Sequence, residues 1–332
     1  MIAFMVRRTL LGVFTVFVIS IISFLIIQLP PGDFVNEYVD TLLGQASLGT
    51  VLSANLKEDM RKDFGLDRPV AVQYLKWVRK VAKGDFGISI EYQKPVWDVV
   101  ASRLVNTVIL AGATILFTWT LALPIGIYSA VRHNSPEDHG VTFVGFLGLA
   151  VPDFLLALAL MWIAYFFFGL SVGGLFSTEY VEASWSFGRV WDLLKHIWIP
   201  ALVLGTSGTA SLIRIMRNNL LDELSKPYVV TARAKGVSEW RLILKYPVRV
   251  ALNPLISTTG YLLPYLVSGS VIVSVVLGLP TVGPLLLRAL LAEDLFMAST
   301  IVLLLGAMTV LGTLISDILL SILDPRIRIG SS

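Results

Sequence analysis

The sequence predicts an all-α membrane protein that crosses the bilayer six times, judged from composition, the length of its apolar segments and the placement of its basic residues. Of its 332 residues, 55% are hydrophobic and only 15% are charged, whereas a soluble domain has roughly 25% charged residues. A soluble chain of this length would leave too much apolar surface in contact with water. We therefore expect the bilayer to solvate much of this chain.

Six segments are long and apolar enough to span a bilayer, and each must be helical because lipid offers backbone groups no hydrogen-bond partner. These segments cover residues 9–29, 103–131, 141–169, 197–213, 254–280 and 297–323. The fourth is short and is interrupted by Gly205 and Gly208. The first follows a basic leader, but its apolar run of about 20 residues is longer than the core of a signal peptide, so we expect a retained helix.

The placement of lysine and arginine orients the chain, because the cytoplasmic loops of membrane proteins are enriched in these residues. With both termini in the cytoplasm, thirteen of the 26 basic residues fall in inner segments. The two short outer loops hold only Arg189, Lys195 and Arg288. The remaining ten lie in the long segment 30–103, which the rule does not count. Both termini are therefore predicted to be cytoplasmic.

The long segment after the first helix is predicted to form a water-facing, mostly helical layer outside the membrane. Its ten basic residues are matched by ten acidic ones. Within it, RPVAVQYLKWVRKVAKG, residues 68–84, fits an amphipathic helix with Pro69 in its first turn. The expected apolar face consists of Val70, Tyr74, Trp77, Val78 and Val81. The layer either packs on the outer membrane surface as a cap or also serves as a platform for a soluble partner.

These features divide the chain into four parts. We expect an N-terminal transmembrane helix at residues 1–30, an extracytoplasmic insertion at 31–100, a core of five transmembrane helices at 101–325 and a cytoplasmic tail at 326–332. The core also contains a long cytoplasmic loop at about 220–250.

The sequence lacks the motifs that indicate ATP binding, serine-nucleophile catalysis or metal binding. No G-x-x-x-x-G-K-[ST] phosphate-binding loop occurs, so the chain is not expected to bind ATP. The stretch LGTSGTAS departs from a serine-nucleophile elbow at Thr209. The histidines at 133, 139 and 196 fall in expected loops and lack metal-ligand spacing, and there is no cysteine. An intramembrane enzyme is therefore disfavoured, and neither a metal nor a cofactor is predicted for this chain.

One acidic residue, Asp153, falls near the middle of the third apolar segment, next to Pro152. A carboxylate inside the bilayer is costly and by default indicates a functional site. Two interpretations stay open: Asp153 lines a pathway and meets a polar or cationic solute, or it bonds to a neighbouring helix or stays protonated. A proton-driven carrier would normally show a relay of such groups, and the sequence places only this one in mid-span.

The cytoplasmic loop contains the passage YVVTARAKGVSEWRLILKYPVR, residues 228–249. Gly236 predicts the end of one short helix, and Ser238 predicts the cap of a second. Trp240, Ile243 and Leu244 form the expected apolar stripe of the second helix. A basic surface resting on anionic lipid is one interpretation. Small residues at the bend favour the other, a two-helix elbow inserted into a groove of another protein.

The motif TARAKG, residues 231–236, followed by ALNP resembles the coupling-loop signature of ABC-transporter permease subunits from binding-protein-dependent importers. The stretches LPPGD, FGLDRPVAVQYLKWV, PVWDVVASRLVNTVILA, LPIGIYSA and ILDPRIR are similar to the dipeptide, oligopeptide and nickel branch, and they span nearly the whole chain in order. The general signature has Glu-Ala-Ala where this chain has Val230, Thr231 and Ala232. We therefore do not expect this chain to contact an ATPase through a glutamate at position 230.

The resemblance implies a type I ABC importer permease for short peptides in the bacterial inner membrane. It also implies a second, usually non-identical permease, two cytoplasmic ATPases that use ATP and Mg, and an extracytoplasmic solute-binding protein. This chain would bind no cofactor and catalyse no reaction, and membrane lipid but no nucleic acid would contact it. The implied ATPase-coupling residues are Thr231, Ala232, Arg233, Ala234, Lys235, Gly236, Ser238 and Trp240.

The translocation pathway is expected to include Asp153 together with polar residues of the fifth segment, and ordinary helix packing is the alternative role for the latter. These residues are Tyr261, Tyr265, Ser268 and Ser270. Oligosaccharide, glutathione or nickel-chelate cargo is an alternative to peptide, since the branch also resembles such systems. A hypothesis from another class is an ion-driven secondary carrier that works alone through Asp153.

Overall fold

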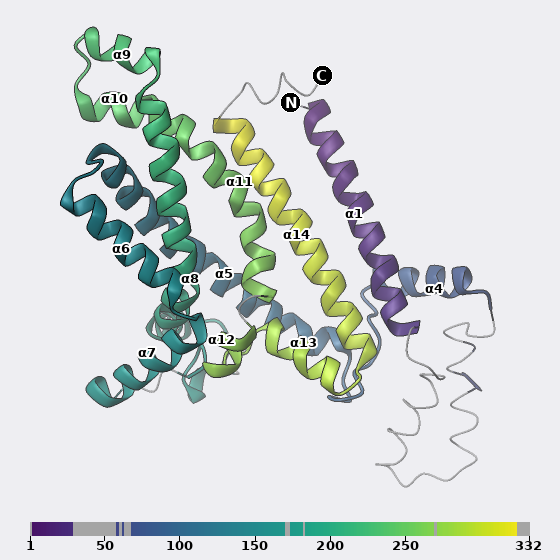
Figure 1. The fold of residues 1–332 in the computed structure, drawn as a ribbon. Coiled ribbons are helices and arrows are strands. Elements are labelled where there is room, and N and C mark those ends of the chain that lie inside the picture. The colour runs from purple at the N-terminus through teal and green to yellow at the C-terminus, as the bar shows by residue number, and fades with distance from the viewer. Residues whose placement is uncertain are drawn as a thin grey trace. The chain divides into compact units, whose positions relative to one another are not determined.

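The computed structural model describes residues 2–28, 58–59, 62, 68–169, 173–181, 183–268 and 271–323. At residues 2–4, 28 and 259–268 it describes the helical backbone without the side chains. Helices dominate the described residues (Figure 1). They are α1 (Ile2–Gln28), α4 (Val70–Ala82), α5 (Val96–Val131), α6 (Pro136–Ala150), α7 (Asp153–Phe168), the short 3₁₀ helix η1 (Thr178–Tyr180), α8 (Phe187–Leu224), α9 (Pro227–Ala234), α10 (Glu239–Lys245), α11 (Pro247–Ser268), α12 (Val271–Val276), α13 (Val282–Leu291) and α14 (Leu295–Leu323).

Within the described residues, four helices are long and apolar enough to cross a membrane: α1, α5, α8 and α14. A fifth candidate span is the pair formed by α6 and α7, which are bent by 99° at the break between them. The predicted all-helical membrane architecture is therefore confirmed with four or five candidate spans. α11, which falls in the expected span 254–280, is not among the four, and the polar run STTGY in its middle lowers its hydropathy.

The structure differs from the predicted spans at two places. The third segment was expected as one span, but it breaks at Val151 and Pro152, because proline lacks a backbone donor and disfavours helical geometry in the preceding residue. The fourth was expected to be interrupted, but α8 runs unbroken through Gly205 and Gly208 for 38 residues, about 57 Å. At Gly205, a Cβ would lie 2.6 Å from Cδ1 of Phe117 on α5, so this glycine permits close helix packing.

Contacts divide the chain into two compact units. The first comprises residues 1–9, 106–280 and 311–332, and the second comprises residues 10–105 and 281–310. Each unit has its own buried hydrophobic clusters. The long helices α1, α5 and α14 each contribute residues to both units.

In the second unit, α4 packs by most of its predicted apolar face. Trp77 is buried, and the hydroxyl of Tyr74 lies 2.7 Å from the Oγ atom of Ser20 on α1. The prediction is wrong at Val70, which is exposed. Gln73 is buried instead, because its side-chain amide donates a hydrogen bond to a backbone carbonyl and so loses little by leaving water.

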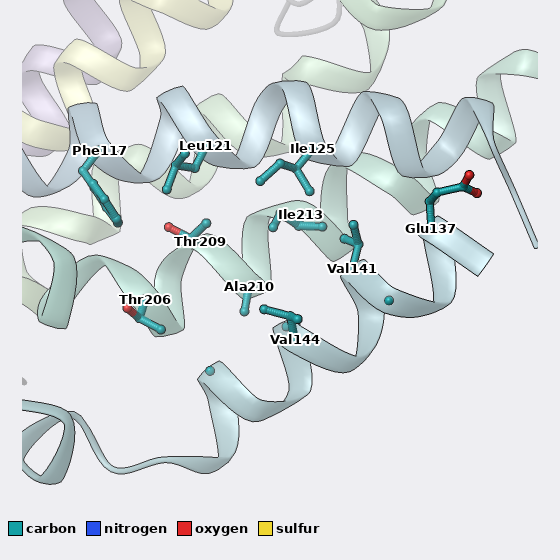
Figure 2. Close-up of a pocket in the computed structure, with 13 residues that line it drawn as sticks. Phe117, Leu121, Ile125, Glu137, Val141, Val144, Thr206, Thr209, Ala210 and Ile213 are labelled. Atoms are coloured by element: carbon teal, nitrogen blue, oxygen red, sulfur yellow. The ribbon is translucent and has the colours of Figure 1, made fainter. Parts of the chain in front are cut away.

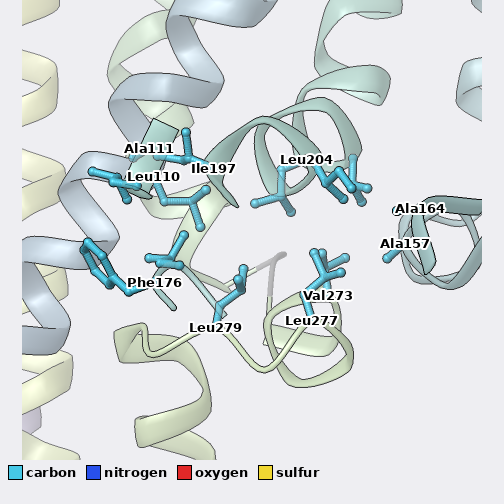
Figure 3. Packing of buried hydrophobic residues seen from close by; sticks show 14 residues of the cluster. Leu110, Ala111, Ala157, Ala164, Phe176, Ile197, Leu204, Val273, Leu277 and Leu279 are labelled. Atoms are coloured by element: carbon cyan, nitrogen blue, oxygen red, sulfur yellow. The ribbon is translucent and has the colours of Figure 1, made fainter. Parts of the chain in front are cut away.

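In the first unit, one core joins α5, α7, α8 and α12 (Figure 3). Ala157 and Ala164 on α7 are buried together with Leu204 on α8 and Val273 on α12. The small side chains of α7 allow its backbone to approach its neighbours, as is common between membrane helices. This core holds the helix that begins at Asp153.

A second core of the first unit joins α5, α8, α9, α10 and α11. Its fully buried side chains include Met216 and Leu220 on α8 and Leu255 on α11. At Gly126 on α5, a Cβ would lie 2.8 Å from the Cβ atom of Met216, so α5 and α8 are in close contact here. This core is the base on which the predicted elbow rests.

Candidate functional site: a two-helix elbow between α8 and α11

The predicted elbow is present but is more compact than the sequence suggested. α8 continues to Leu224 and α11 begins at Pro247, so only residues 225–246 lie outside these two helices. Within them, α9 and α10 lie together beyond the ends of α8 and α11 (Figure 1). The elbow is defined here as residues 225–246.

The bend between the helices is a glycine-dependent helix ending. Gly236 has a φ of +78°, which glycine adopts without strain. The backbone N–H of Gly236 donates to the carbonyl of Arg233, and the N–H of Val237 donates to the carbonyl of Ala232, at 3.0 and 3.3 Å. These two bonds form the Schellman motif, which satisfies carbonyls that a helix end leaves free. The predicted role of Gly236 as a helix stop is confirmed.

The second helix begins directly after the bend. Ser238 occupies the N-cap position of α10, as expected, but its side chain makes no capping hydrogen bond. Its backbone carbonyl accepts from the N–H of Leu242 at 2.9 Å. Ser238 therefore starts the helix through its extended backbone and not through its hydroxyl.

An ion pair connects the two helices across the bend. The guanidinium of Arg233 donates from Nε and Nη2 to the two carboxylate oxygens of Glu239, at 3.1 and 2.5 Å. These hydrogen bonds lower the pKa of Glu239 and raise the pKa of Arg233, so the pair stays charged at neutral pH. Both side chains are half exposed, so the pair sets geometry more than it adds stability.

A second polar contact ties α9 to the end of α8. The hydroxyl of Tyr228 donates to a carboxylate oxygen of Glu223 at 2.5 Å. Burial, together with this bond to the carboxylate, raises the pKa of Tyr228, so the phenol stays protonated. Thr231 donates within α9 to the carbonyl of Pro227 at 2.9 Å.

Three buried side chains anchor the elbow to the membrane helices. Val229 on α9 and Leu242 and Ile243 on α10 lie in the core shared with α5, α8 and α11. Burying each of them stabilises the folded chain by about 2 kcal/mol. The predicted stripe of Trp240, Ile243 and Leu244 is therefore wrong in part, because the buried face of α10 is the adjacent pair 242 and 243.

The outer face of the elbow exposes aromatic, aliphatic and basic side chains. Trp240 is 60% exposed and Leu244 is 52% exposed, and both line a hollow of about 470 Å³ against α5. Ala234 and Lys235 are exposed at the bend, and Ala232 is partly buried beneath it. A surface with exposed aromatic anchors and cations suits insertion into another protein, where such residues are enriched.

Comparisons with known proteins identify the family of this chain. The model of the family described as "Binding-protein-dependent transport system inner membrane component" matches residues 122–329. A model of the N-terminal part of the same kind of component matches residues 1–111. The chain belongs to this family. It is therefore an inner-membrane permease component of a transport system that works with a binding protein and, in general, with ATPase partners.

Named relatives align with the permease over nearly its whole length. The oligopeptide transport system permease protein AppB of Bacillus subtilis is 36% identical over 99% of this chain and 100% of its own length. A putative peptide permease protein of Brucella ovis is 31% identical over 99% of this chain and 100% of its own length. The di/tripeptide transport system permease protein DppB of Pseudomonas aeruginosa is 30% identical over 99% of each chain.

The predicted pathway residues of the permease are placed only in part. Asp153 is the first residue of α7, directly after the break, and is half-buried. This position also suits a structural role, since a carboxylate stabilises the positive end of a helix. Tyr261, Tyr265 and Ser268 fall in α11 where side chains are not described, and Ser270 lies outside the described residues.

Sequence analysis missed a buried ion pair close to the elbow. Asp138 on α6 is only 1% exposed and pairs with Arg217 on α8. The start of α6 could have been recognised from Ser135, which caps the helix by accepting from the N–H of Asp138 at 3.2 Å. The partner could not, because Arg217 is one of several basic residues in this part of the chain and lies 79 residues away from Asp138 in sequence.

Proposed function

We propose that the permease carries short peptides in an ATP-driven ABC importer, and that the elbow at 225–246 docks into a groove of a separate ATPase subunit. Peptide cargo is supported by the names of relatives at 30–36% identity over the full length. The observation that carries the docking proposal is that the elbow is anchored by buried side chains while Trp240 and Leu244 stay exposed beside a hollow against α5.

The proposed arrangement has six spans with both termini in the cytoplasm. α11 and α12 together serve as the fifth span, and the bent pair α6 and α7 serves as the third. Residues 31–100 then lie outside, as a layer that the solute-binding protein reaches, and residues 326–332 form a cytoplasmic tail. The thirteen basic residues in inner segments support this orientation.

The proposed mechanism is mechanical coupling. Two ATPase subunits bind ATP and Mg and close on each other, and each moves the elbow of the permease seated on it. One elbow belongs to this chain and the other to a second, non-identical permease. Because Val229, Leu242 and Ile243 are packed against α5, α8 and α11, displacement of the elbow moves these helices with it. The permease pair thereby switches between outward-open and inward-open arrangements.

The proposed coupling surface consists of the motif residues and the start of α10. Arg233 and Gly236 hold the bend, whereas Thr231, Ala234, Lys235 and Trp240 are exposed. For the pathway we propose Asp153 and the polar residues of α11. Oligosaccharide, glutathione or nickel-chelate cargo is the alternative, and it is decided by the pocket of the binding protein.

The experiment that tests this function is isolation of the complex with its neighbouring gene products. We expect two ATPases and a second permease to co-purify with the tagged chain, and vesicles holding the complex to import short peptides only with ATP and binding protein. Uphill import by this chain alone would overturn the proposal and support an ion-driven carrier. In that case Asp153→Asn should abolish import.

A further inference from the structure

One turn of α8 contacts two different partners. Met216 and Leu220 are fully buried and lie in the core that holds Val229, Leu242 and Ile243 of the elbow. Arg217, which lies between them in sequence, instead extends to α6. The same helical turn therefore connects the elbow on one side with α6 on the other.

The contact with α6 is a closed polar network around one carboxylate. Nε of Arg217 donates to Oδ1 of Asp138 at 2.8 Å, and Nη2 donates to Oδ2 at 2.7 Å. Oδ1 also accepts from the hydroxyl of Ser129 on α5, and Oδ2 accepts from the N–H of Asn134 at 3.0 Å. The bidentate geometry fixes the direction as well as the distance between α6 and α8.

Beside this network, a hollow borders the contact between α6 and α8. A hollow of about 530 Å³ lies between α5, α6 and α8, lined mainly by apolar side chains such as Leu121, Val144 and Ile213 (Figure 2). α6 and α8 stay in contact along this hollow, where a Cβ at Gly145 would lie 3.9 Å from the Cβ atom of Ala210. The first turn of α6 is joined to α8 by the bidentate ion pair, which fixes their relative direction there.

We propose that the Arg217–Asp138 pair is the joint that passes movement of the elbow to α6, and through α6 to the break that precedes Asp153. The two residues are positioning residues and touch no cargo. This inference rests on the proposed function, because it assigns the route by which a displaced elbow reaches the pathway. It predicts that breaking the pair separates ATP hydrolysis from import without releasing the ATPases.

The first test uses the reconstituted complex carrying Asp138→Asn or Arg217→Lys. We expect peptide imported per ATP hydrolysed to fall at least tenfold, with co-purification of the ATPases unchanged. Glu137→Gln is the matched control for Asp138→Asn, since it makes the same chemical change at the exposed neighbouring position. An unchanged ratio in both variants would overturn the inference while leaving the proposed function intact.

The second test replaces the ion pair by a covalent bond. The chain has no cysteine, and the spacing of Gly145 and Ala210 matches the Cβ separation of a disulfide. We expect the Gly145→Cys/Ala210→Cys disulfide to restore the import ratio of Asp138→Asn to within twofold of the parent, and reduction to remove that rescue. Failure of the rescue would overturn the inference.

If Asp138→Asn does not fold, the same disulfide in the otherwise unaltered permease still tests the inference. The inference requires α6 and α8 to move together, so the cross-linked permease should import at the normal ratio. Blocked import that returns on reduction would show that the helices must separate, and would overturn it. Failure of the unaltered permease to bind ATPases would instead overturn the proposed function.

Discussion

Arg233 and Glu239 face each other across the bend between α9 and α10, with Nη2 of the arginine 2.5 Å from Oε1 of the glutamate. The pair joins the last turn of one elbow helix to the first residue of the next. It therefore fixes the angle at which the outer face of the elbow is presented. Arg233 falls in the motif TARAKG and could also contact the ATPase directly, and these two roles can be separated.

Reversing the charges distinguishes the two roles. Arg233→Glu places two carboxylates together, and we expect it to lower cargo-stimulated ATP hydrolysis and import several-fold. The double variant Arg233→Glu/Glu239→Arg restores the pair and should recover most of the activity if its role is to hold the bend. A double variant as weak as the single one would show that Arg233 acts on the partner.

The same pair makes a prediction for pH. Hydrogen bonding to Arg233 lowers the pKa of Glu239 from 4.5, so the stability it contributes is present above that value and is lost as pH falls through the lowered one. The melting temperatures of the parent and of Glu239→Gln should therefore differ by a constant amount between about pH 6 and pH 8. A difference that changes within this range would contradict the assignment.

Position 236 favours glycine because of its backbone conformation and not because neighbouring atoms leave no room for a side chain. Its φ is +78°, yet a Cβ there would meet no atom within 4 Å. Gly236→Val should cost at least about 1–2 kcal/mol of strain in the left-handed region and reduce coupling, whereas Gly236→Asn should be tolerated, because asparagine adopts this conformation more readily. Coupling is measured as peptide imported per ATP hydrolysed.

Gly112 on α5 provides the control for this series. A Cβ there also meets no atom within 4 Å, but its φ is not positive. Gly112→Ala should leave import unchanged. Normal coupling in Gly236→Val would remove the bend from the mechanism.

Two leucines of α10 separate stability from docking. Leu242 is fully buried, so Leu242→Ala should destabilise the chain by about 2–5 kcal/mol through the cavity it leaves. Leu244 is 52% exposed, so Leu244→Ala should change stability by no more than about 0.5 kcal/mol. We expect Leu244→Ala to weaken ATPase binding instead. Thermal unfolding in detergent and ATPase co-purification measure the two effects, and the reverse pattern would contradict the buried face assigned to α10.

Asp153 either lines the pathway or has only a structural role, and its variants distinguish the two. As the first residue of α7, its carboxylate stabilises that helix end by about 0.3–1 kcal/mol whether or not cargo passes it. If it lines the pathway, Asp153→Leu should lower import or change the range of peptides carried, with ATPase binding unaffected. Unchanged import of every peptide tested would leave only the interaction of Asp153 with the positive end of α7.

The membrane class, the C-terminal ends of three helices and the elbow could be read from short stretches of sequence, because each depends on local properties. Apolar length predicted α1, α5 and α14 to within a few residues at their C-terminal ends. Gly236 predicted the bend, since glycine ends helices wherever it occurs with this pattern. The predicted interruption of the fourth span at Gly205 is wrong, because this glycine is a site of close contact with α5.

By itself, the sequence determined that this protein is a helical membrane permease with a two-helix elbow, because hydropathy and helix-stop signals act within a few turns of chain. Tertiary structure alone decided that Leu242 and Ile243 face inward, that α6 and α7 meet at a sharp bend, and that Arg217 finds Asp138. The reason is physical: burial and ion pairing depend on which distant helices become neighbours, and no local pattern encodes the partner of a charge 79 residues away.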